Sequence, residues 1–372
     1  MKVLIVGAGA SGVVAAISYK RNHPSDDVLV IEHLDRPLKK LLATGNGKCN
    51  LGNSNIDYNL YSHPEFVKPI IEKYNVKELF DSLSLEVKEM NGLLYPYSES
   101  AVSVRNALLN EIEKLGIAIN IDEKLLDYEI NNSIKAKTSK NVYQVDRLYL
   151  ASSLLSGKNL GSDGSVLEIL KRHNYKIVEP LPALCPIYTF EKTKQLDGTR
   201  AKCLVKLMQN NKEIYEENGE VLFKDKGLSG IAIFNASLFI ARSKKKADKI
   251  IIDLLPNYSQ KEIENYCKSH TFNGFLQGFL NPKIIEYLLD RFNGEKDIIS
   301  SIKNLEFSFK DFCGFDYSQV SVGGINISCV KNDLESTLEK GVYLLGELLD
   351  IDGPCGGYNL TWAFASALIS TK

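Results

Sequence analysis

Two short, uninterrupted apolar runs open the chain, at residues 2–6 (KVLIV) and 28–31 (VLVI). Runs of this length without a polar interruption are typical of strands that are buried on both faces. Residues 13–20, between the two runs, predict a helix. The pattern therefore predicts a strand, a helix and a second strand, which is the unit from which parallel sheets are built.

The region from Cys185 to Phe223 has a different pattern, in which apolar and polar residues alternate. Alternation with a period of two predicts antiparallel strands with one buried face. Turn residues at Asn210-Asn211 and at Asn218-Gly219 divide this region into strands. A short helix is expected to start at residues 227–230 and to continue through residue 240. We therefore expect a β-rich region here.

Helical patterns follow, and two of them carry clear start signals. Ser259 and Glu262 have the spacing of a capping box. Asn281-Pro282 supplies an N-cap followed by proline at the first helical position. The chain then closes with an apolar strand at residues 342–345, a glycine-rich stretch and a helix that is expected to start near Leu360.

Composition narrows the class of protein. The chain has 372 residues and a formal net charge of −1, with a pI of about 6.6. It therefore lacks the excess of basic residues that would indicate a nucleic acid or a membrane surface as partner. The seven cysteines are odd in number and contain no CxxC pair, which disfavours a disulfide framework and fits a reducing compartment. The five histidines are scattered without metal-ligand spacing.

The chain also lacks an apolar stretch of membrane-spanning length, and its first apolar run is too short for a signal peptide. We therefore expect a soluble, cytoplasmic protein with a small-molecule substrate, no nucleic-acid partner, no membrane contact and no metal, and we leave the oligomeric state open. The run Lys244-Lys245-Lys246 is expected to be a solvated charge run.

The turn after the first predicted strand is rich in glycine, with the sequence GAGASG at residues 7–12. Gly7 permits the tight turn, Gly9 lets backbone N–H groups approach a pyrophosphate, and Gly12 lets the helix lie close to the strand. Glu32 ends the second strand and can accept hydrogen bonds from a ribose diol. The strand, turn, helix and distal acid together predict a dinucleotide-binding unit.

A second glycine-rich junction between a strand and a helix lies at the other end of the chain, at residues 346–359 (GELLDIDGPCGGYN). Ligands of such sheets bind outside the carboxyl ends of the strands, so both junctions are expected to converge on one ligand, with the middle of the chain inserted as a cap. The amino end of the last helix favours negative charge, which a reduced flavin carries at the N1/C2 edge of its ring. This arrangement favours FAD over NAD.

Three segments resemble those of one known family: GAGASG, LLATGNGKCNLGN and GELLDIDGPCGGYNLTWAFAS. They are similar to the BaiN-like or "aminoacetone oxidase" family of NAD(P)/FAD-dependent oxidoreductases, within the glutathione-reductase-type FAD superfamily. YPYSESAVSV, GEVLFKDKGLSG and VSVGGI also stand where this family has related segments, so the resemblance spans essentially the whole chain.

The resemblance implies an α/β fold with a Rossmann-like FAD-binding domain split between the N- and C-terminal segments, and with an inserted β-rich, barrel-like domain and a small helical domain. The implied boundaries are 1–184 and 320–372 for the FAD-binding domain, 185–243 and 300–319 for the β-rich insert, and 244–299 for the helical subdomain.

The resemblance also implies the residues that bind FAD. The turn of Gly7, Gly9, Ala10, Ser11 and Gly12 would face the pyrophosphate, and Glu32 the adenosine ribose. The flavin would be lined by residues of the second and third segments: Lys40, Thr44, Gly45, Asn46, Gly346, Glu347, Asp350, Gly357, Tyr358 and Asn359. No catalytic residue is assigned.

The chain departs from the family pattern at several positions. Ser152-Ser153 stand where Thr-Gly-Gly usually follows, and residues 156–165 are altered. Lys48 replaces the usual Arg, which loses bidentate geometry, and Ile231 replaces the usual Pro. These departures concern a second contact to the nucleotide and the substrate pocket.

Other side chains near these segments are given structural roles. Cys49 and Cys355 are expected to pack as small residues, because they lack the CxxC spacing of a dithiol relay. His33 and His63 are expected at the surface.

The preferred hypothesis is an FAD-dependent oxidoreductase that transfers hydride between a small organic substrate and bound flavin, either by reducing a conjugated double bond or by oxidising an amine. Only one dinucleotide fingerprint is present, so NAD(P)H, if it is the reductant, would dock transiently. One alternative is a flavin-binding redox sensor or assembly protein with little turnover. Another, an FAD enzyme that modifies RNA, is disfavoured by the near-neutral charge.

Overall fold

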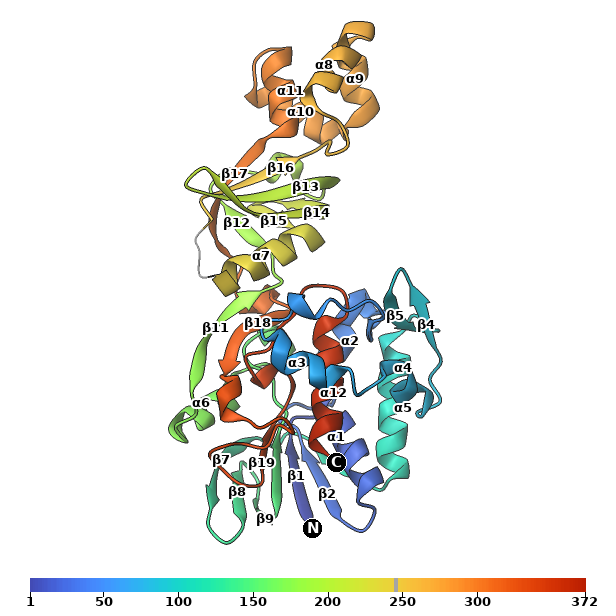
Figure 1. Ribbon diagram of the computed structural model, residues 1–372, viewed down its shortest axis with the longest axis vertical. Helices are drawn as coiled ribbons and strands as arrows, with labels where there is room; N and C mark the ends of the chain where they lie inside the picture. The colour runs from blue at the N-terminus through green and yellow to red at the C-terminus, as the bar shows by residue number, and fades with distance from the viewer. Residues whose placement is uncertain (244–246) are drawn as a thin grey trace. The chain divides into compact units, whose positions relative to one another are not determined.

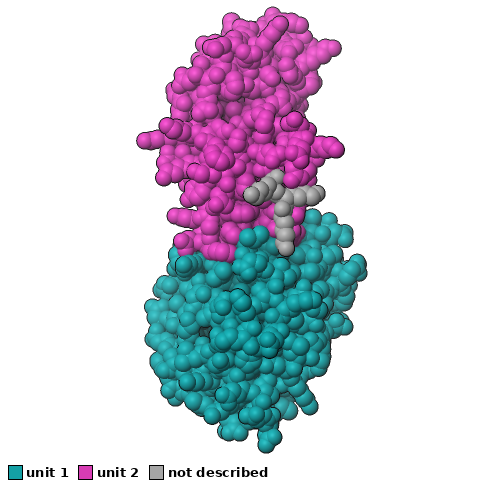
Figure 2. Space-filling view, turned by 90° about the vertical axis from the view of Figure 1, so that its left-hand side faces the viewer, with its two compact units in different colours: residues 1–181, 320–372 teal, residues 182–319 magenta. Residues whose placement is uncertain are grey.

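The computed structural model describes residues 1–243 and 247–372, and the chain divides into two compact units (Figure 2). Unit 1 contains Met1–Leu181 and Val320–Lys372, and unit 2 contains Pro182–Gln319. Each unit has its own cluster of buried apolar side chains. The run Lys244–Lys246, expected to be a solvated charge run, lies outside the described residues.

Unit 1 is built on a five-stranded parallel sheet with the strand order β19-β10-β1-β2-β6 (Figure 1). The strands are β1 (Lys2–Val6), β2 (Asp27–Ile31), β6 (Ala118–Asn120), β10 (Arg147–Leu150) and β19 (Val342–Leu344). In the centre, Ile5 of β1 is level with Val30 of β2 and with Tyr149 of β10. The sheet takes strands from both ends of the chain, which confirms the split Rossmann-like α/β arrangement that the sequence predicts.

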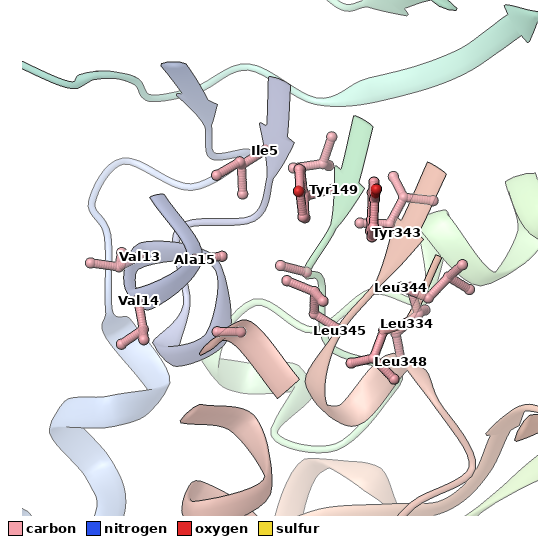
Figure 3. Packing of buried hydrophobic residues seen from close by; sticks show 14 of the residues in the cluster. Ile5, Val13, Val14, Ala15, Tyr149, Leu334, Tyr343, Leu344, Leu345 and Leu348 are labelled. Carbon is pink, nitrogen blue, oxygen red and sulfur yellow. The ribbon is translucent and has the colours of Figure 1, made fainter. Parts of the chain in front are cut away.

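Two helices, α1 (Ala10–Asn22) and α12 (Tyr358–Ser370), lie side by side against this sheet. Figure 3 shows apolar side chains of β1, α1, β10 and β19 packing together at its centre. The rings of Tyr149 and Tyr343 stack there, with centroids 4.5 Å apart and planes 9° from parallel. The Tyr149 hydroxyl also donates to the carbonyl of Ser370 at 3.0 Å, which fastens the last turn of α12 to the sheet.

Smaller elements surround the main sheet of unit 1. They are the helices α2 (Lys39–Ala43), α3 (Pro64–Ile71), α4 (Val76–Asp81), α5 (Ala101–Lys114) and α6 (Ser165–Arg172), a sheet of β3 (Gly52–Asn53), β5 (Leu93–Pro96) and β4 (Val87–Met90), a sheet of β7 (Leu125–Ile130), β8 (Ile134–Thr138) and β9 (Val142–Val145), and the pair β11 (Ile177–Ala183) and β18 (Val320–Ile325).

Unit 2 is a closed six-stranded barrel with helices added to it. Around the barrel the strands are β12 (Ile187–Thr189), β15 (Gly227–Ser229), β14 (Lys212–Lys224), β13 (Arg200–Gln209), β16 (Lys249–Asp253) and β17 (Leu305–Phe312). The helices are α7 (Ile231–Ser243), which packs on β14, and α8 (Gln260–Ser269), α9 (Phe272–Phe279), α10 (Pro282–Arg291) and α11 (Glu295–Lys303), which are inserted between β16 and β17. The capping box at Ser259 and the Asn281 cap are both formed, as predicted.

Three local predictions in unit 2 were wrong. Asn218-Gly219 is not a turn but lies inside β14, opposite β13, because Gly219 gives room for α7: a Cβ on Gly219 would lie 3.1 Å from that of Ala232. Gly227–Ser229 is a strand and not the start of a helix, and α7 begins only at Ile231. Lys249–Asp253 falls in the segment expected to be helical, but its run of isoleucines forms a barrel strand.

Candidate functional site

The turn between β1 and α1 is shaped by its glycines. Gly7 has φ +99°, and a Cβ on it would lie 2.9 Å from the carbonyl oxygen of Ala151 at the end of β10. A Cβ on Gly12 would lie 1.9 Å from the carbonyl oxygen of Gly7, so helix and turn are in direct contact. A Cβ on Gly9 would meet no protein atom within 4 Å. The turn is therefore closed on the protein side and open at Gly9.

Helix α1 begins at this opening without a side-chain cap. The first N–H groups of a helix have no partner inside the helix, and the helix dipole adds partial positive charge there. An uncapped amino end beside an open glycine is the arrangement that binds phosphate groups. The residues therefore fit the pyrophosphate of a dinucleotide.

Glu32 lies directly after β2 and is 7% exposed. One carboxylate oxygen accepts the N–H of Ala8 at 2.8 Å, and the other accepts the N–H of Leu34 at 3.0 Å. Burial alone would raise the pKa of Glu32, but hydrogen bonds from His33, Leu34 and Ala8 outweigh it and lower the pKa. Glu32 is thus a fixed, ionised acceptor beside the glycine turn, which suits a ribose hydroxyl and repels a 2′-phosphate.

The third segment meets the first at Gly346, just after β19. Gly346 has φ +61°, and a Cβ on it would lie 2.9 Å from the hydroxyl oxygen of Ser11 in α1. Helix α12 holds this glycine from behind: Ser366 Oγ accepts the Gly346 N–H at 3.0 Å, and Trp362 Nε1 donates to the Gly346 carbonyl at 3.0 Å. Gly346 and the glycine turn are therefore neighbours, although they come from opposite ends of the chain.

The second segment meets the third in two places. Lys40 Nζ donates to Glu347 Oε2 at 2.8 Å, and this pair is partly buried. At the start of α12, a Cβ on Gly357 would lie 2.4 Å from the carbonyl oxygen of Gly52. The amide of Asn50, oriented to satisfy its neighbours, accepts the Gly357 N–H at 3.1 Å. The three segments thus form one continuous surface in unit 1.

The loop between α2 and β3 has an unusual backbone. Gly45, Asn46 and Cys49 all have φ between +55° and +59°. Residues of this conformation concentrate at functional sites, where surrounding contacts hold them. Gly45 and Asn46 are exposed, whereas Cys49 is fully buried, and burial raises the pKa of its thiol to about 11. The loop is therefore available to a ligand, while Cys49 is placed to pack and not to react.

Four of the expected flavin-lining side chains have partners within the protein. Thr44 donates its hydroxyl to the Leu41 carbonyl at 2.7 Å, and Asp350 faces His63 Nε2 at 3.2 Å. The Tyr358 hydroxyl accepts the Asp57 N–H at 3.2 Å. The amide of Asn359 bonds both backbone groups of Gly353, at 2.9 and 2.8 Å. Their expected contact with the flavin stays a prediction, and helix α12 offers its uncapped amino end there.

The residues after β10, among them Ser152-Ser153 and the altered residues 156–165, contact this surface. Lys40 Nζ also donates to Ser156 Oγ at 3.0 Å and to Ser153 Oγ at 3.3 Å, and Ser156 donates to Glu347. Within the described residues, the hydroxyl oxygens of Ser152 and Ser321 are buried without a hydrogen-bond partner. A buried hydroxyl that lacks a partner fits a polar ligand that would supply one.

Two histidines contribute to the site in a way that the sequence did not reveal. His33 is exposed, as expected, but its ring bridges Glu32 and the carbonyl of Gly161. His63 is half-buried against Asp350. Adjacency to Glu32 is the only signal in the sequence that could have drawn attention to His33.

The fold and the three joined segments together define the class of protein, a Rossmann-type FAD-dependent oxidoreductase. The chain belongs to the family described as HI0933-like protein Rossmann domain, which it matches over residues 1–372.

Comparison with characterised proteins agrees with this class. The chain is 31% identical to the 3-dehydro-bile acid delta(4,6)-reductase of Clostridium scindens, over 100% of this chain and 98% of the relative. It is 26% identical to the ribosomal RNA dihydrouridine synthase of Haemophilus influenzae, over 98% and 96% of the two chains. Among solved structures, a mutant of E. coli quinol fumarate reductase FrdA shares the fold with a TM-score of 0.53 at 11% identity, over 100% of this chain and 69% of the other.

Two properties hold for residues 1–243 and 247–372. Every helix in them is too short or too polar to cross a bilayer. No three His, Cys, Asp or Glu side chains of these residues are grouped to hold a metal ion.

Proposed function

We propose that this protein reduces a carbon–carbon double bond that is conjugated to a carbonyl group in a small organic substrate, using bound FAD and with NAD(P)H as the transient reductant. The observation that carries the proposal is the joining of the three segments in unit 1, where Gly346 meets Ser11, Lys40 meets Glu347 and Asn50 meets Gly357.

The type of bond is inferred from the two relatives together. A 3-dehydro-bile acid with delta(4,6) unsaturation has double bonds conjugated to its 3-carbonyl group, and dihydrouridine differs from uridine by saturation of a ring double bond conjugated to a carbonyl. The named substrates differ greatly in size and charge, whereas the reduced bond is of the same type. The similarity therefore supports a bond class more strongly than any one substrate.

When bound, FAD supplies hydride transfer, and the protein supplies position and electrostatics. In the proposal, the uncapped start of α1 holds the pyrophosphate, and ionised Glu32 holds the adenosine ribose. The start of α12 stabilises negative charge on the reduced ring. Lys40 stays paired with Glu347, which fixes the direction of both side chains beside the cofactor.

The test begins with the absorption spectrum of the purified protein, repeated after anaerobic addition of NADH or NADPH. We expect a bound flavin whose absorption band bleaches with one of the two donors. Addition of a 3-oxo-4,6-diene steroid, or of a smaller conjugated enone, should then restore the band without oxygen. A flavin that no donor bleaches, or that only dioxygen reoxidises, would contradict the proposal.

RNA is the competing substrate, because a second relative of this chain is named for ribosomal RNA. The net charge of −1 disfavours it, since binding to the phosphate backbone needs clustered cations. Salt-dependent binding of a ribosomal RNA fragment, with reduction of its uridines, would favour RNA over a small molecule. Tight FAD binding with negligible turnover on every substrate would instead favour a redox sensor.

A further inference from the structure

The ring of His33 has a hydrogen-bond acceptor at each of its two nitrogens. Nδ1 lies 3.0 Å from Glu32 Oε1, and Nε2 lies 2.7 Å from the carbonyl oxygen of Gly161. A neutral imidazole carries one N–H and can donate to only one of them. The doubly protonated imidazolium donates to both. The geometry therefore selects the charged form of the ring.

The charged groups around His33 agree with this assignment. The carboxylates of Glu32, from the end of β2, and of Asp163, from the segment before α6, both interact with the ring. Asp163 is itself paired with Lys124, at 2.6 Å, so Glu32 is the dominant neighbour. The hydrogen bond to Glu32 raises the pKa of His33, against the opposing effect of burial.

Gly161 belongs to residues 153–164, which we call the departure strap because they include Ser153 and most of the altered residues 156–165. At one end of the strap, Ser153 and Ser156 accept hydrogen bonds from Lys40. At the other end, a Cβ on Gly161 would lie 2.4 Å from the Leu34 side chain, and the Gly161 carbonyl faces His33. The strap thus joins the part of the site with the Lys40–Glu347 pair to the part with Glu32.

These two attachment points coincide with the two halves of the FAD site described above. Glu32 stands where the adenosine ribose is expected, and Lys40 where the flavin half is expected. His33 therefore contacts both the Glu32 carboxylate, which would bind the cofactor, and the departure strap, which reaches from Glu32 to Lys40. Glu32 Oε1 already accepts from Leu34 and His33. Within the described residues Oε2 accepts one hydrogen bond, from the Ala8 N–H, so it is the oxygen with room for a ribose hydroxyl.

We propose that His33 is a positioning residue for FAD: its imidazolium fixes the Glu32 carboxylate and fastens the departure strap, so that the affinity for FAD falls when the ring loses its proton. This inference rests on FAD binding at the proposed site but not on the identity of the substrate. The effect is reciprocal, because bound FAD would favour the protonated ring by the same factor.

The direction of the pH dependence follows from the raised pKa of His33. Below the ordinary imidazole pKa the ring is protonated in the free and the bound protein, and affinity is highest. As the pH rises through the raised pKa, one of the two acceptors faces a lone pair and its contact is lost. If the pKa of His33 is higher by about one unit in the FAD-bound protein than in the free protein, the dissociation constant for FAD rises about tenfold over this pH range.

The experiment measures FAD binding to the full-length apoprotein by fluorescence quenching, from about pH 6 to about pH 8.5, the range in which histidine titrates. The wild type should weaken about tenfold across this range. His33→Gln should bind FAD more weakly at the acid end and show a flat profile. His270→Gln is the matched control, because His270 lies in unit 2, where its ring stacks on Tyr266 and its Nδ1 lies 3.1 Å from the Tyr266 carbonyl oxygen; it should keep the wild-type profile.

A second measurement follows the strap without FAD. Hydrogen exchange of residues 157–164, corrected for the intrinsic pH dependence, should be faster in His33→Gln than in the wild type at the acid end, and equal at the alkaline end. The same pH profile for FAD binding in both proteins, or equal exchange throughout, would overturn the role of His33 while leaving the proposed function intact. A wild type that binds no FAD at any pH would overturn both.

Discussion

At the scale of single residues, two glycines of the same turn meet very different surroundings. Gly12 faces the Gly7 carbonyl, whereas Gly9 faces open space. In the fingerprint of a dinucleotide site, the second glycine lets the backbone approach the pyrophosphate of the cofactor, whereas the third lets the helix pack closely. In the apoprotein, the surrounding protein therefore restricts the side chain at position 12 but not the one at position 9. Matched alanine substitutions therefore separate folding from cofactor binding.

Gly12→Ala is expected to lower the free energy of unfolding of the apoprotein by about 1–3 kcal/mol, because the new methyl group must displace the turn. Gly9→Ala is expected to leave the unfolding curve unchanged but to weaken FAD binding, because its methyl group would occupy the open space in which we propose that the pyrophosphate binds. Urea denaturation and FAD titration of both variants check this. Equal loss of stability in the two would contradict the assignment of the open side of the turn.

The contacts of His33 are a feature of single residues that the sequence could not predict. The chain order places it beside Glu32, but nothing in the order indicates that Gly161 lies on the other side of the ring. That contact depends on how residues 153–164 return to the end of β2, and Gly161 lies among the altered residues 156–165, which depart from the family pattern.

At the scale of elements, the predictions succeeded where local signals and tertiary packing agree. The strands at residues 2–6 and 28–31, the capping box at Ser259 and the closing helix were all predictable, because each has a pattern complete within a few residues. Asn218-Gly219 failed, because the same dipeptide that makes a turn also makes room for a helix on a barrel strand. Only the packing of α7 distinguishes the two.

Helix α12 stabilises the junction at Gly346. Ser366 is fully buried and accepts the N–H of Gly346. Ser366→Ala leaves that N–H without a partner and should lower the free energy of unfolding of unit 1 by about 1–3 kcal/mol. Trp362 is the single tryptophan and lies in the same helix, so its fluorescence reports the unfolding of unit 1 directly.

Ser370→Ala is a suitable control for Ser366→Ala, since the Ser370 hydroxyl, within the described residues, donates to the Ala367 carbonyl of the same helix and to no other group. A smaller loss of stability is expected there, with no effect on FAD. If Ser366→Ala and Ser370→Ala had equal effects on stability and on FAD affinity, α12 would not be holding the Gly346 junction.

At the scale of the whole molecule, the two units have separate apolar cores, and the residues of the proposed FAD site all belong to unit 1. The boundary residues Leu181 and Val320 belong to strands β11 and β18, which pair with one another. A short Gly-Ser linker can therefore join Leu181 to Val320 in place of unit 2. The shortened protein is expected to fold and to bind FAD.

The absorption spectrum and circular dichroism of this shortened protein, with added FAD, check the expectation. A protein that folds but stays colourless with added FAD would contradict the placement of the cofactor site in unit 1.

The five-stranded sheet also sets an order of events during translation. Strand β19 and helix α12 are synthesised well after β1 and its glycine turn, although β19 lies in the same sheet as β1. The contiguous residues 182–319 can fold between these two events. Binding of FAD at the proposed site is therefore expected only after residues 342–370 have joined the sheet.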